Sequence, residues 1–442
     1  MTPAASSTPL RVGLAGLGTV GGGTYAVLTR NAEEIRRRAG RAIEIVAVAD
    51  LDQEKARALT QGRCPIFADA REMLANTELD VVVELIGGYG FAREFVLEAI
   101  SQGLHVVTAN KALLAVHGRE IFPAAQAKGV SIGFEAAVAG GIPIIKALRE
   151  GLTANRIDWV AGIINGTTNF ILSEMRDKGL SFDTVLAEAQ RLGYAEADPT
   201  FDIEGVDAAH KITLMSAIAF GMPVKFDQAH IEGITKLQSI DIRYAEQLGY
   251  RIKLLGITKR RAHGVELRVH PTLIPAKRLI ANVEGAMNAV FVKGDAVGQT
   301  LYYGKGAGAE PTASAVIADL VDLARALHAP LEDRVPALAF QPDQMQDMPV
   351  LPVAETQTGF YLRLRVKDQS GVLADITRAL ADGGISIDAF IQREPAEGED
   401  ETDVILLTHT CLEREMRLAI AKIVQLSTVV GAPVTLRVET FA

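Results

Sequence analysis

A chain of 442 residues exceeds the size of a single hydrophobic core, so we expect two or three domains. Its 48% apolar and 22% charged residues are typical of a folded globular protein and exclude general disorder. A net charge of −9 without long runs of like charge argues against nucleic-acid binding. We interpret the basic cluster at 34–41 as a solvated helix end.

The two cysteines and the lengths of the apolar runs indicate where in the cell the protein is expected. Cys64 and Cys411 lie far apart with no partner at metal-ligand spacing, which predicts neither a disulfide framework nor a zinc site and fits the reducing cytoplasm. No apolar run approaches the ~18 residues of a membrane span. Residues 1–9 lack the features of a signal peptide, and we expect them to form a short disordered lead.

Residues 10–135 alternate short apolar runs with stretches of about one helix length. Continuous apolar runs are typical of parallel strands that are covered on both faces. The segment therefore predicts an α/β fold with a Rossmann-type doubly wound parallel sheet. The expected strands are "LRVGLAGLG", "IEIVAVAD", "DVVVELIG", "LHVVTAN" and "GVSIGFEAA".

From residue 136 to 340 the pattern changes to that of an α+β domain. We expect helices at around 170–192 and 205–220, followed by strands in "YRIKLLGITKRR" and "VELRVHPTLIP". A helical pattern at about 310–328 has Pro311 in its first turn, and we expect this helix to pack back on the first domain.

The proline- and glutamine-rich residues 341–357 have the composition of a linker. Residues 358–442 then show the order strand, helix, strand, strand, helix, strand. This order predicts a ferredoxin-like third domain.

A glycine motif follows the first expected strand. Gly16, Gly18 and Gly21 form the pattern G-x-G-x-x-G before a potential helix, where backbone amides can approach a pyrophosphate. Asp50 ends the second strand and would favour NAD, whereas nearby Lys55 and Arg57 would suit the 2′-phosphate of NADP. The sequence therefore does not decide between NAD and NADP.

Two charged residues follow later strands of the first domain. Lys111 stands at the carboxyl edge of the sheet, where it can meet a cofactor or a substrate carboxylate, or else be a surface lysine at a helix start. Glu135 precedes small residues whose carbonyl groups, together with one carboxylate, suit a weakly held hard cation. The competing interpretation is a tight helix entry at Pro143.

Five carboxylates lie within twelve residues before an apolar helix. Asp207 and Lys211 are four residues apart and share one helix face, which can be a surface salt bridge or part of a site for an ammonium group and a proton. His210 lies about 100° around the helix from Lys211, and we expect it on the surface. The carboxylates are Glu196, Asp198, Asp202, Glu204 and Asp207.

Together these motifs resemble the homoserine dehydrogenase family, in its monofunctional bacterial form with a C-terminal ACT domain. The resemblance covers nearly the whole chain from about residue 10. It implies NAD(P)-dependent interconversion of L-aspartate 4-semialdehyde and L-homoserine, in the route to threonine, methionine and isoleucine. The motifs are "GLGTVGGG", "TANKALL", "EAAVAGGIPII", "NGTTNFIL", "GYAEADPTFDIEGVDAAHK" and "YGKGAGAEPTASAV".

The resemblance also implies roles for single residues. Lys211 matches the proton donor and acceptor, and Lys111 matches a lysine shared by cofactor and substrate. Substrate contacts are implied for Glu196 and Asp207, with Asp202 in support. Nucleotide contacts are implied for Thr19, Val20, Thr108, Gly193 and Gly308, and a structural sodium site for Glu135 with the carbonyl groups of Val138, Gly140 and Ile142.

The third domain resembles ACT domains, which bind amino acids between copies of the chain. Asp368 and Gly371 match the turn that offers helix amides to a carboxylate, so threonine is the expected effector and a homodimer or homotetramer the expected assembly. Two alternatives are an aldehyde dehydrogenase that forms an acyl phosphate, which needs a nucleophilic cysteine, and a nucleotide- and amino-acid-binding regulator without catalysis.

Overall fold

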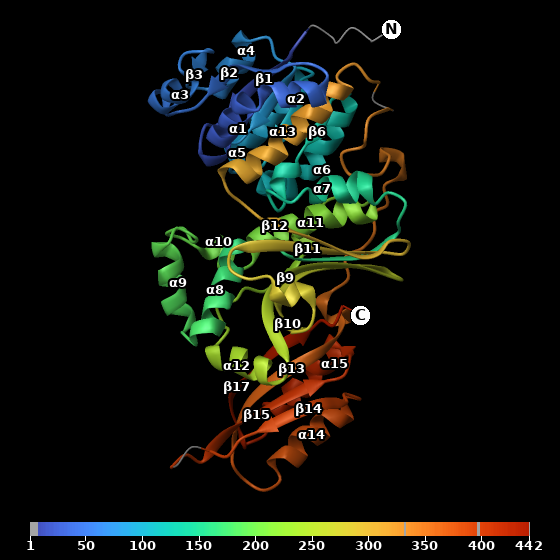
Figure 1. Ribbon diagram of the computed structural model, residues 1–442. Coiled ribbons are helices and arrows are strands. Elements are labelled where there is room, and N and C mark those ends of the chain that lie inside the picture. The colour runs from blue at the N-terminus through green and yellow to red at the C-terminus, as the bar shows by residue number, and fades with distance from the viewer. Residues whose placement is uncertain (1–7, 331–332, 396–397, 442) are drawn as a thin grey trace.

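The computed structural model describes residues 8–330, 333–395 and 398–441, and these form an amino-terminal, a middle and a carboxyl-terminal unit in a row (Figure 1). Most of the expected disordered lead, residues 1–7, lies outside the described residues. No helix in the described ranges is long and apolar enough to cross a membrane.

The amino-terminal unit is a parallel sheet of order β3-β2-β1-β4-β5-β6 with helices on both faces. Its strand order reverses between β1 and β4, which places the ligand crevice of such folds at the carboxyl ends of these strands. The strands are β1 (Leu10–Ala15), β2 (Ile43–Ala49), β3 (Ile66–Phe67), β4 (Val81–Glu84), β5 (His105–Thr108) and β6 (Ile132–Gly133). The helices between them are α1 (Thr19–Arg30), α2 (Ala32–Ala39), α3 (Gln53–Thr60), α4 (Ala70–Asn76), α5 (Gly90–Ser101) and α6 (Lys111–Ala127).

Helix α13 (Ala309–Ala326) follows β12 and packs back on the amino-terminal unit, as predicted (Figure 1). Alternate residues of one strand point to opposite faces. Val81 and Val83 therefore pack in the hydrophobic cluster that contains Val316 of α13, while Val82 packs in the cluster that contains Phe95 of α5. Both faces of the sheet are covered, which explains the continuous apolar runs.

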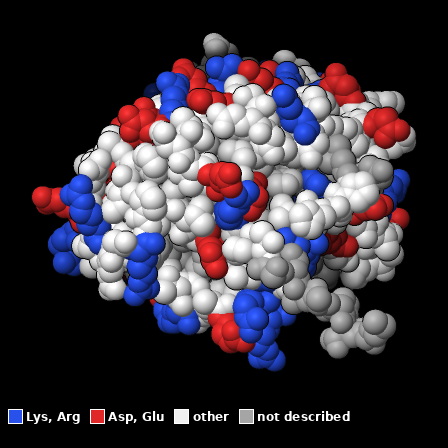
Figure 2. Space-filling view, turned by 90° about the horizontal axis from the view of Figure 1, so that it is seen from above, with Lys and Arg blue, Asp and Glu red and all other residues white. Residues whose placement is uncertain are grey.

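The basic cluster at 34–41 is largely a solvated helix end, as predicted. Arg36 pairs with Glu33, and Arg37 and Arg38 pair with Glu34 along the exposed face of α2. Viewed onto this end of the molecule, blue and red side chains are intermixed (Figure 2). Such pairs contribute little to stability and leave no large field of one sign.

The middle unit places helices on a mixed sheet. The expected helix at 170–192 is two helices, because Gly179 adopts φ 64° and Ser181 starts a new helix as its N-cap. The helices are α7 (Ile144–Lys146), α8 (Gly166–Lys178), α9 (Phe182–Arg191), α10 (Thr200–Ile203), α11 (Val206–Phe220) and α12 (Ser239–Gln247). The strands are β7 (Ile157–Ile163), β8 (His230–Ile231), β9 (Tyr250–Arg261), β10 (Gly264–Pro275), β11 (Met287–Gly294) and β12 (Gly298–Lys305).

The carboxyl-terminal unit has the predicted ferredoxin-like order, with one added short strand. A hydrophobic cluster that includes Leu364, Ile376 and Ile423 joins its two helices to one sheet face. Its elements are β13 (Gln357–Lys367), α14 (Val372–Asp382), β14 (Ile387–Gln392), β15 (Glu401–Thr408), β16 (Cys411–Leu412), α15 (Glu413–Ile423) and β17 (Val429–Val438).

The middle and carboxyl-terminal sheets are continuous, in the order β12-β11-β7-β9-β10-β17-β13-β15-β14. Strand β17 pairs in parallel with β10 through Thr272 opposite Arg437 and Leu273 opposite Val438. Ion pairs cross this junction: Arg268 and Glu439 form a buried pair at 2.5 Å, and Arg437 Nη1 lies 2.9 Å from Oε2 of the partly exposed Glu232 of the middle unit. The carboxyl-terminal unit is therefore bonded to the middle unit and is more than a tethered module.

The contact between α1 and α13 yields a first prediction. A methyl group added at Gly23 would lie 2.5 Å from the carbonyl oxygen of Ala309, so Gly23→Ala should force the two helices apart. We expect it to lower the free energy of unfolding by about 1–3 kcal/mol, measured by denaturant titration.

Gly22→Ala is the matched control, because a methyl group there meets nothing closer than 3.8 Å. Alanine favours a helix interior by about 1 kcal/mol over glycine, so this control should be neutral or stabilising. Equal effects of the two substitutions would contradict the packing argument.

Candidate active site

The glycine motif forms a tight loop between β1 and α1. Gly16 adopts φ 92°, and a methyl group added at Gly21 would overlap the carbonyl oxygen of Gly16, so both positions require glycine. Space is open around Gly18, and no side chain caps the start of α1 at Thr19. Free helix amides beside an open cradle fit the pyrophosphate of a dinucleotide.

Asp50, at the end of β2, supports this loop directly. Its carboxylate accepts hydrogen bonds from the backbone amides of Leu17 and Asp52. The aspartate that was expected to meet a ribose therefore also fixes the glycine loop.

Glu84 is a buried carboxylate at the end of β4 that the sequence analysis missed. It accepts hydrogen bonds from the amides of Ile86 and Gly87 and, at 2.6 Å, from Thr108 Oγ1 at the end of β5. It thereby ties together the two loops at the carboxyl edge of the sheet. The sequence signal for this residue is an acidic side chain within the otherwise apolar strand "DVVVELIG".

Lys211 and Asp207 form a buried ion pair on α11, not a surface salt bridge. Lys211 Nζ lies 2.6 Å from Asp207 Oδ2 and donates a hydrogen bond of 2.7 Å to the carbonyl oxygen of Ile164. Nearly every residue of α11 is buried, because the helix lies between α6 of the amino-terminal unit and strands β7, β9 and β10. The lysine is therefore held in one place.

Lys111 joins this pair from the amino-terminal unit. Its Nζ lies 3.2 Å from Asp207 Oδ1 and 6.0 Å from the ring centroid of Phe201. Asn110 caps α6 by accepting a hydrogen bond from the Leu113 amide, which fixes the turn that carries the lysine. One carboxylate thus lies between two lysines from two units.

Asn165 is a second residue that the sequence analysis missed. Its Nδ2 donates hydrogen bonds to Asp202 Oδ1 at 2.6 Å and to Asp207 Oδ2 at 2.9 Å. Asp202 is thereby placed beside the cluster, as expected. The polar start of "NGTTNFIL" gave a helix-cap signal but did not indicate the contact with the carboxylates.

The charges in the cluster shift one another's pKa values. Burial raises the pKa of Asp207, but Lys211 and Lys111 outweigh it and hold that pKa well below its usual range. Burial lowers the pKa of Lys211, and Asp207 opposes this shift. Burial and the charge of Asp207 raise the pKa of Asp202. The lysine is thus a polarised group that can exchange a proton with a bound oxygen.

His210 is not on the surface as expected. It is fully buried, with its ring centroid 4.3 Å from that of Phe226 and 5.2 Å from that of Phe201, and burial lowers its pKa to about 4. The helix packs on all sides, so a rotation of about 100° leads to another buried face. Within the described ranges neither ring nitrogen has a hydrogen-bond partner.

Two further predicted residues lie outside the lysine cluster. Glu196 is exposed on the loop after α9, and within the part of the chain that the structure describes its carboxylate bonds to no member of the cluster. Gly193 ends α9 with φ 77° on the same exposed loop. In contrast, Gly308 starts α13 beside Gly23, close to the glycine loop.

Glu135, the carboxylate of the expected cation site, also stabilises the backbone around it. Both oxygens of buried Glu135 accept backbone hydrogen bonds, from Ile145 at 2.9 Å and Lys146 at 2.7 Å, and so cap the short helix entry after Pro143. Burial, followed by the charge of Asp319, raises the pKa of Glu135 to about 7. No group of three or more His, Cys, Asp or Glu residues with metal-ligand geometry occurs in the ranges described.

The turn before α14, where the amino-acid site was predicted, has an uncapped helix start. Gly371 adopts φ 95° at the N-cap, no side chain caps the helix, and Asp368 is exposed one turn earlier. The helix amides are therefore open to a carboxylate.

Neither cysteine reaches the lysine cluster. Cys64 is half-buried against the hydrophobic cluster under α13, and burial raises its pKa, while Cys411 packs in the carboxyl-terminal unit. Neither is an activated nucleophile, which removes the support for acyl-phosphate chemistry.

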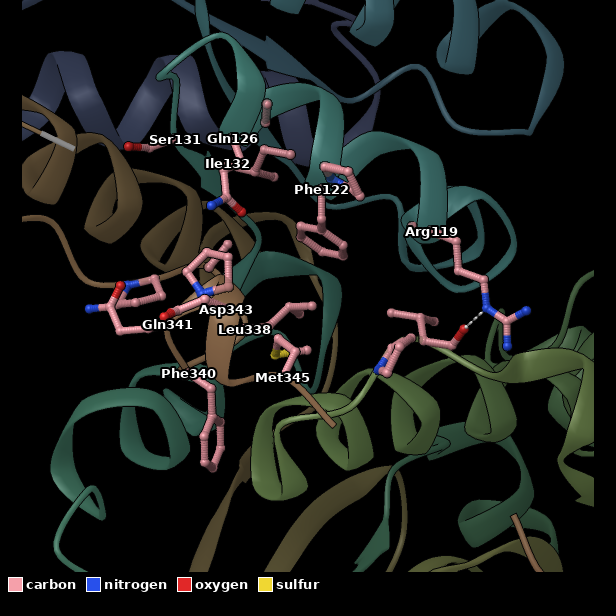
Figure 3. Close-up of a pocket in the computed structure, with 18 of the residues that line it drawn as sticks. Arg119, Phe122, Gln126, Ser131, Ile132, Leu338, Phe340, Gln341, Asp343 and Met345 are labelled. Atoms are coloured by element: carbon pink, nitrogen blue, oxygen red, sulfur yellow. Dashed lines mark hydrogen bonds between the residues drawn. The ribbon is translucent and has the colours of Figure 1, made fainter. Parts of the chain in front are cut away.

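A large cavity of about 1020 Å³ lies apart from the cluster (Figure 3). It is bordered by the second half of α6, including Arg119 and Phe122, and by the segment that carries Leu338 and Met345. Arg119 donates a hydrogen bond to the Val224 carbonyl at its edge. None of the predicted catalytic residues lines it.

A dinucleotide loop beside a buried lysine–carboxylate cluster defines the class of NAD(P)-dependent oxidoreductases. Family models match the chain as the homoserine dehydrogenase NAD-binding domain over residues 16–135, homoserine dehydrogenase over 143–321 and the ACT domain over 360–426.

Homoserine dehydrogenase of Pseudomonas aeruginosa is 60% identical over 431 residues, covering 98% of this chain and 99% of that protein. That of Neisseria gonorrhoeae is 58% identical, with the same coverage. The crystal structure of a homoserine dehydrogenase from Thiobacillus denitrificans matches with a TM-score of 0.95 and 63% identity, covering 99% of this chain and 100% of that chain. The chain belongs to the homoserine dehydrogenase family, and the predicted fold class and family are confirmed.

The raised pKa of Glu135 predicts how stability depends on pH. Below pH 4.5 the folded and unfolded states are both protonated at this group, whereas between pH 4.5 and about 7 the unfolded state loses the proton first. In buffer without sodium, the free energy of unfolding should therefore fall as pH rises through this window, and Glu135→Gln should flatten that part of the profile in denaturant titrations.

Glu44→Gln is the control, because it removes an exposed carboxylate on β2. It should leave the profile of the unsubstituted protein unchanged. A profile that Glu135→Gln does not alter would show that burial of this carboxylate has no such effect.

Proposed function

We propose that Lys211 is the proton donor and acceptor in the interconversion of L-aspartate 4-semialdehyde and L-homoserine. The observation that carries this proposal is the buried position of its Nζ between Asp207 and the carbonyl oxygen of Ile164. The nicotinamide, when bound, supplies or accepts the hydride. Lys211 then donates a proton to the aldehyde oxygen as it becomes an alkoxide, or accepts it in the reverse direction.

We assign the substrate ammonium group to Asp207 and Glu196, with Asp202 in support. Asp207 and Asp202 already share the cluster, and their negative charges complement an ammonium group. The loop of Glu196 is held by Gln190, whose side-chain amide donates to the carbonyl oxygens of Glu196 and Ala197, and its carboxylate stays exposed. Lys111 lies where a substrate carboxylate or the cofactor can meet it.

We infer that the dinucleotide binds at the glycine loop. The open cradle at Gly16, Gly18 and Gly21 and the uncapped start of α1 support this assignment. Asp50 suits NAD, and Lys55 and Arg57 suit NADP, so turnover with both cofactors decides between them. Further nucleotide contacts are assigned to Thr19, Val20, Thr108, Lys111, Gly193 and Gly308.

We infer that Glu135 and the carbonyl groups of Val138, Gly140 and Ile142 hold a structural sodium ion. A buried carboxylate whose pKa is raised is relieved by a nearby cation. The carbonyl oxygens of Val138 and Gly140 accept no hydrogen bond from any described residue, which leaves them available as ligands.

We infer that threonine binds at Asp368 and Gly371 and regulates activity. The uncapped start of α14 supports binding, and the junction with β17 supports communication. Arg437 of β17 pairs with Glu232, and nearby Ile234 and Thr235 bond to Ile203 and Glu204 just before α11.

We also infer a homodimer or homotetramer in the cytoplasm. ACT domains bind amino acids between copies, and edge strands β12 and β14 carry the exposed side chains of Tyr303 and Phe390, which suit such contacts. Both cysteines are free, which is consistent with a reducing compartment.

Replacing Lys211 tests the main assignment. Lys211→Met keeps most of the buried volume but removes the proton, so turnover of homoserine should fall at least about 100-fold while the cofactor still binds. Formation of NADH and NADPH at 340 nm measures turnover, and quenching of nucleotide fluorescence measures binding.

Lys253→Met is the matched control, because Lys253 is another buried lysine of the middle unit, bonded to Asn169 and the Val283 carbonyl. It should lose little turnover. Near-normal turnover in Lys211→Met, or an equal loss in Lys253→Met, would remove the assignment.

Threonine inhibition tests the regulatory assignment. Added threonine should lower the turnover of the unsubstituted enzyme, and Asp368→Asn should abolish that inhibition with basal turnover intact. Asp382→Asn makes the same charge change at the other end of α14 and should keep the inhibition. Inhibition that persists in Asp368→Asn would place the effector elsewhere.

A further inference from the structure

Residues 164 and 165 follow β7 directly and hold both members of the ion pair. The carbonyl oxygen of Ile164 accepts a hydrogen bond from Lys211, and the side chain of Asn165 donates one to Asp207. The same two-residue segment therefore fixes the lysine and its carboxylate partner. We propose that Asn165 is a positioning residue that orients Asp207 and Asp202 for the reaction. This inference rests on the proposed role of Lys211.

Asn165 uses its donors and its acceptor for different tasks. Its Oδ1 accepts hydrogen bonds from the Thr168 amide at 2.8 Å and the Thr168 hydroxyl at 2.9 Å, which caps α8 and locks the side chain. Its Nδ2 is then aimed at the two carboxylates. A primary amide offers two N–H groups on one nitrogen together with a separate acceptor, a combination that neither serine nor aspartate has.

The two carboxylates need such a donor, because they are like charges, with Asp207 buried and Asp202 half-buried. Asp202 raises the local negative charge beside Asp207, and Asn165 gives each of them one N–H. Asp207 is then held on three sides, with Oδ2 shared by Asn165 and Lys211 and Oδ1 facing Lys111. Its carboxylate has no freedom to turn.

Removal of the Asn165 side-chain amide leaves the repulsion between Asp202 and Asp207 uncompensated. Asp207 and Asp202 then turn away from each other, and Lys211 loses the fixed partner that sets its position. A misplacement of about 1 Å at a reacting group lowers turnover on the order of 100-fold. The dinucleotide loop lies on another unit, so cofactor binding is unaffected.

Asn165→Ser tests the inference, because serine still caps a helix but cannot reach both carboxylates. We expect kcat for homoserine to fall about 10- to 100-fold, with the Kd for NADPH unchanged within about twofold. Asn165→Asp is isosteric, also caps α8, and adds a third carboxylate, so its loss should be larger. Asp69→Ala, which removes an exposed cap on α4, is the control for loss of a cap and should retain its kcat.

A double-mutant cycle separates positioning from a general structural defect. In an Asp202→Asn background the repulsion is absent, so Asn165→Ser should lower kcat by less than about threefold. An equal loss in both backgrounds, or unchanged kcat in both Asn165 variants, would overturn the inference. A loss of NADPH binding in either Asn165 variant would also overturn it. Lys211→Met tests the proton donor separately. If Lys211→Met is inactive while Asn165→Ser keeps its kcat, only the inference about Asn165 is refuted.

Discussion

The buried ion pair between Lys211 and Asp207 is the constraint on which the site depends. Removing two charges from water costs several kcal/mol per ion, and this cost is repaid only when the remaining donors and acceptors are satisfied. Here the Ile164 carbonyl, Asn165 and Lys111 complete the arrangement. The acidic stretch before α11 is thus part of a satisfied network, and the apolar remainder of the helix holds that network in place.

This network also requires two units of the chain to meet. Asp207 and Lys211 belong to the middle unit, whereas Lys111 begins α6 of the amino-terminal unit at the carboxyl edge of its sheet. Glu84 ties the two loops at this edge together through Thr108. Lys211 and the dinucleotide loop therefore lie on either side of one interface, the arrangement that the proposed hydride transfer to a bound aldehyde requires.

The sequence predicted the features that depend on local patterns. The glycine loop, the return of α13 and the strand order of the last unit all follow from short-range periodicity and turn residues. The contacts of Asn165 and Glu84 were missed because they join residues that are far apart in sequence. His210 was misplaced because a helical period indicates an angle but not how many sides of the helix are covered, and α11 is covered on all of them.

The junction between the middle and carboxyl-terminal units follows the same electrostatic rule as the active site. Arg268 lies between Glu266 and Glu439, and Arg437 lies between Glu413 and Glu232, all close to the pairing of β10 with β17. Displacement of β17 would leave buried charges unpaired, which is costly. The carboxyl-terminal unit therefore cannot shift without moving Glu232. Because Ile234 and Thr235 bond to Ile203 and Glu204 just before α11, the junction at Arg437 is connected to the helix that carries Asp207.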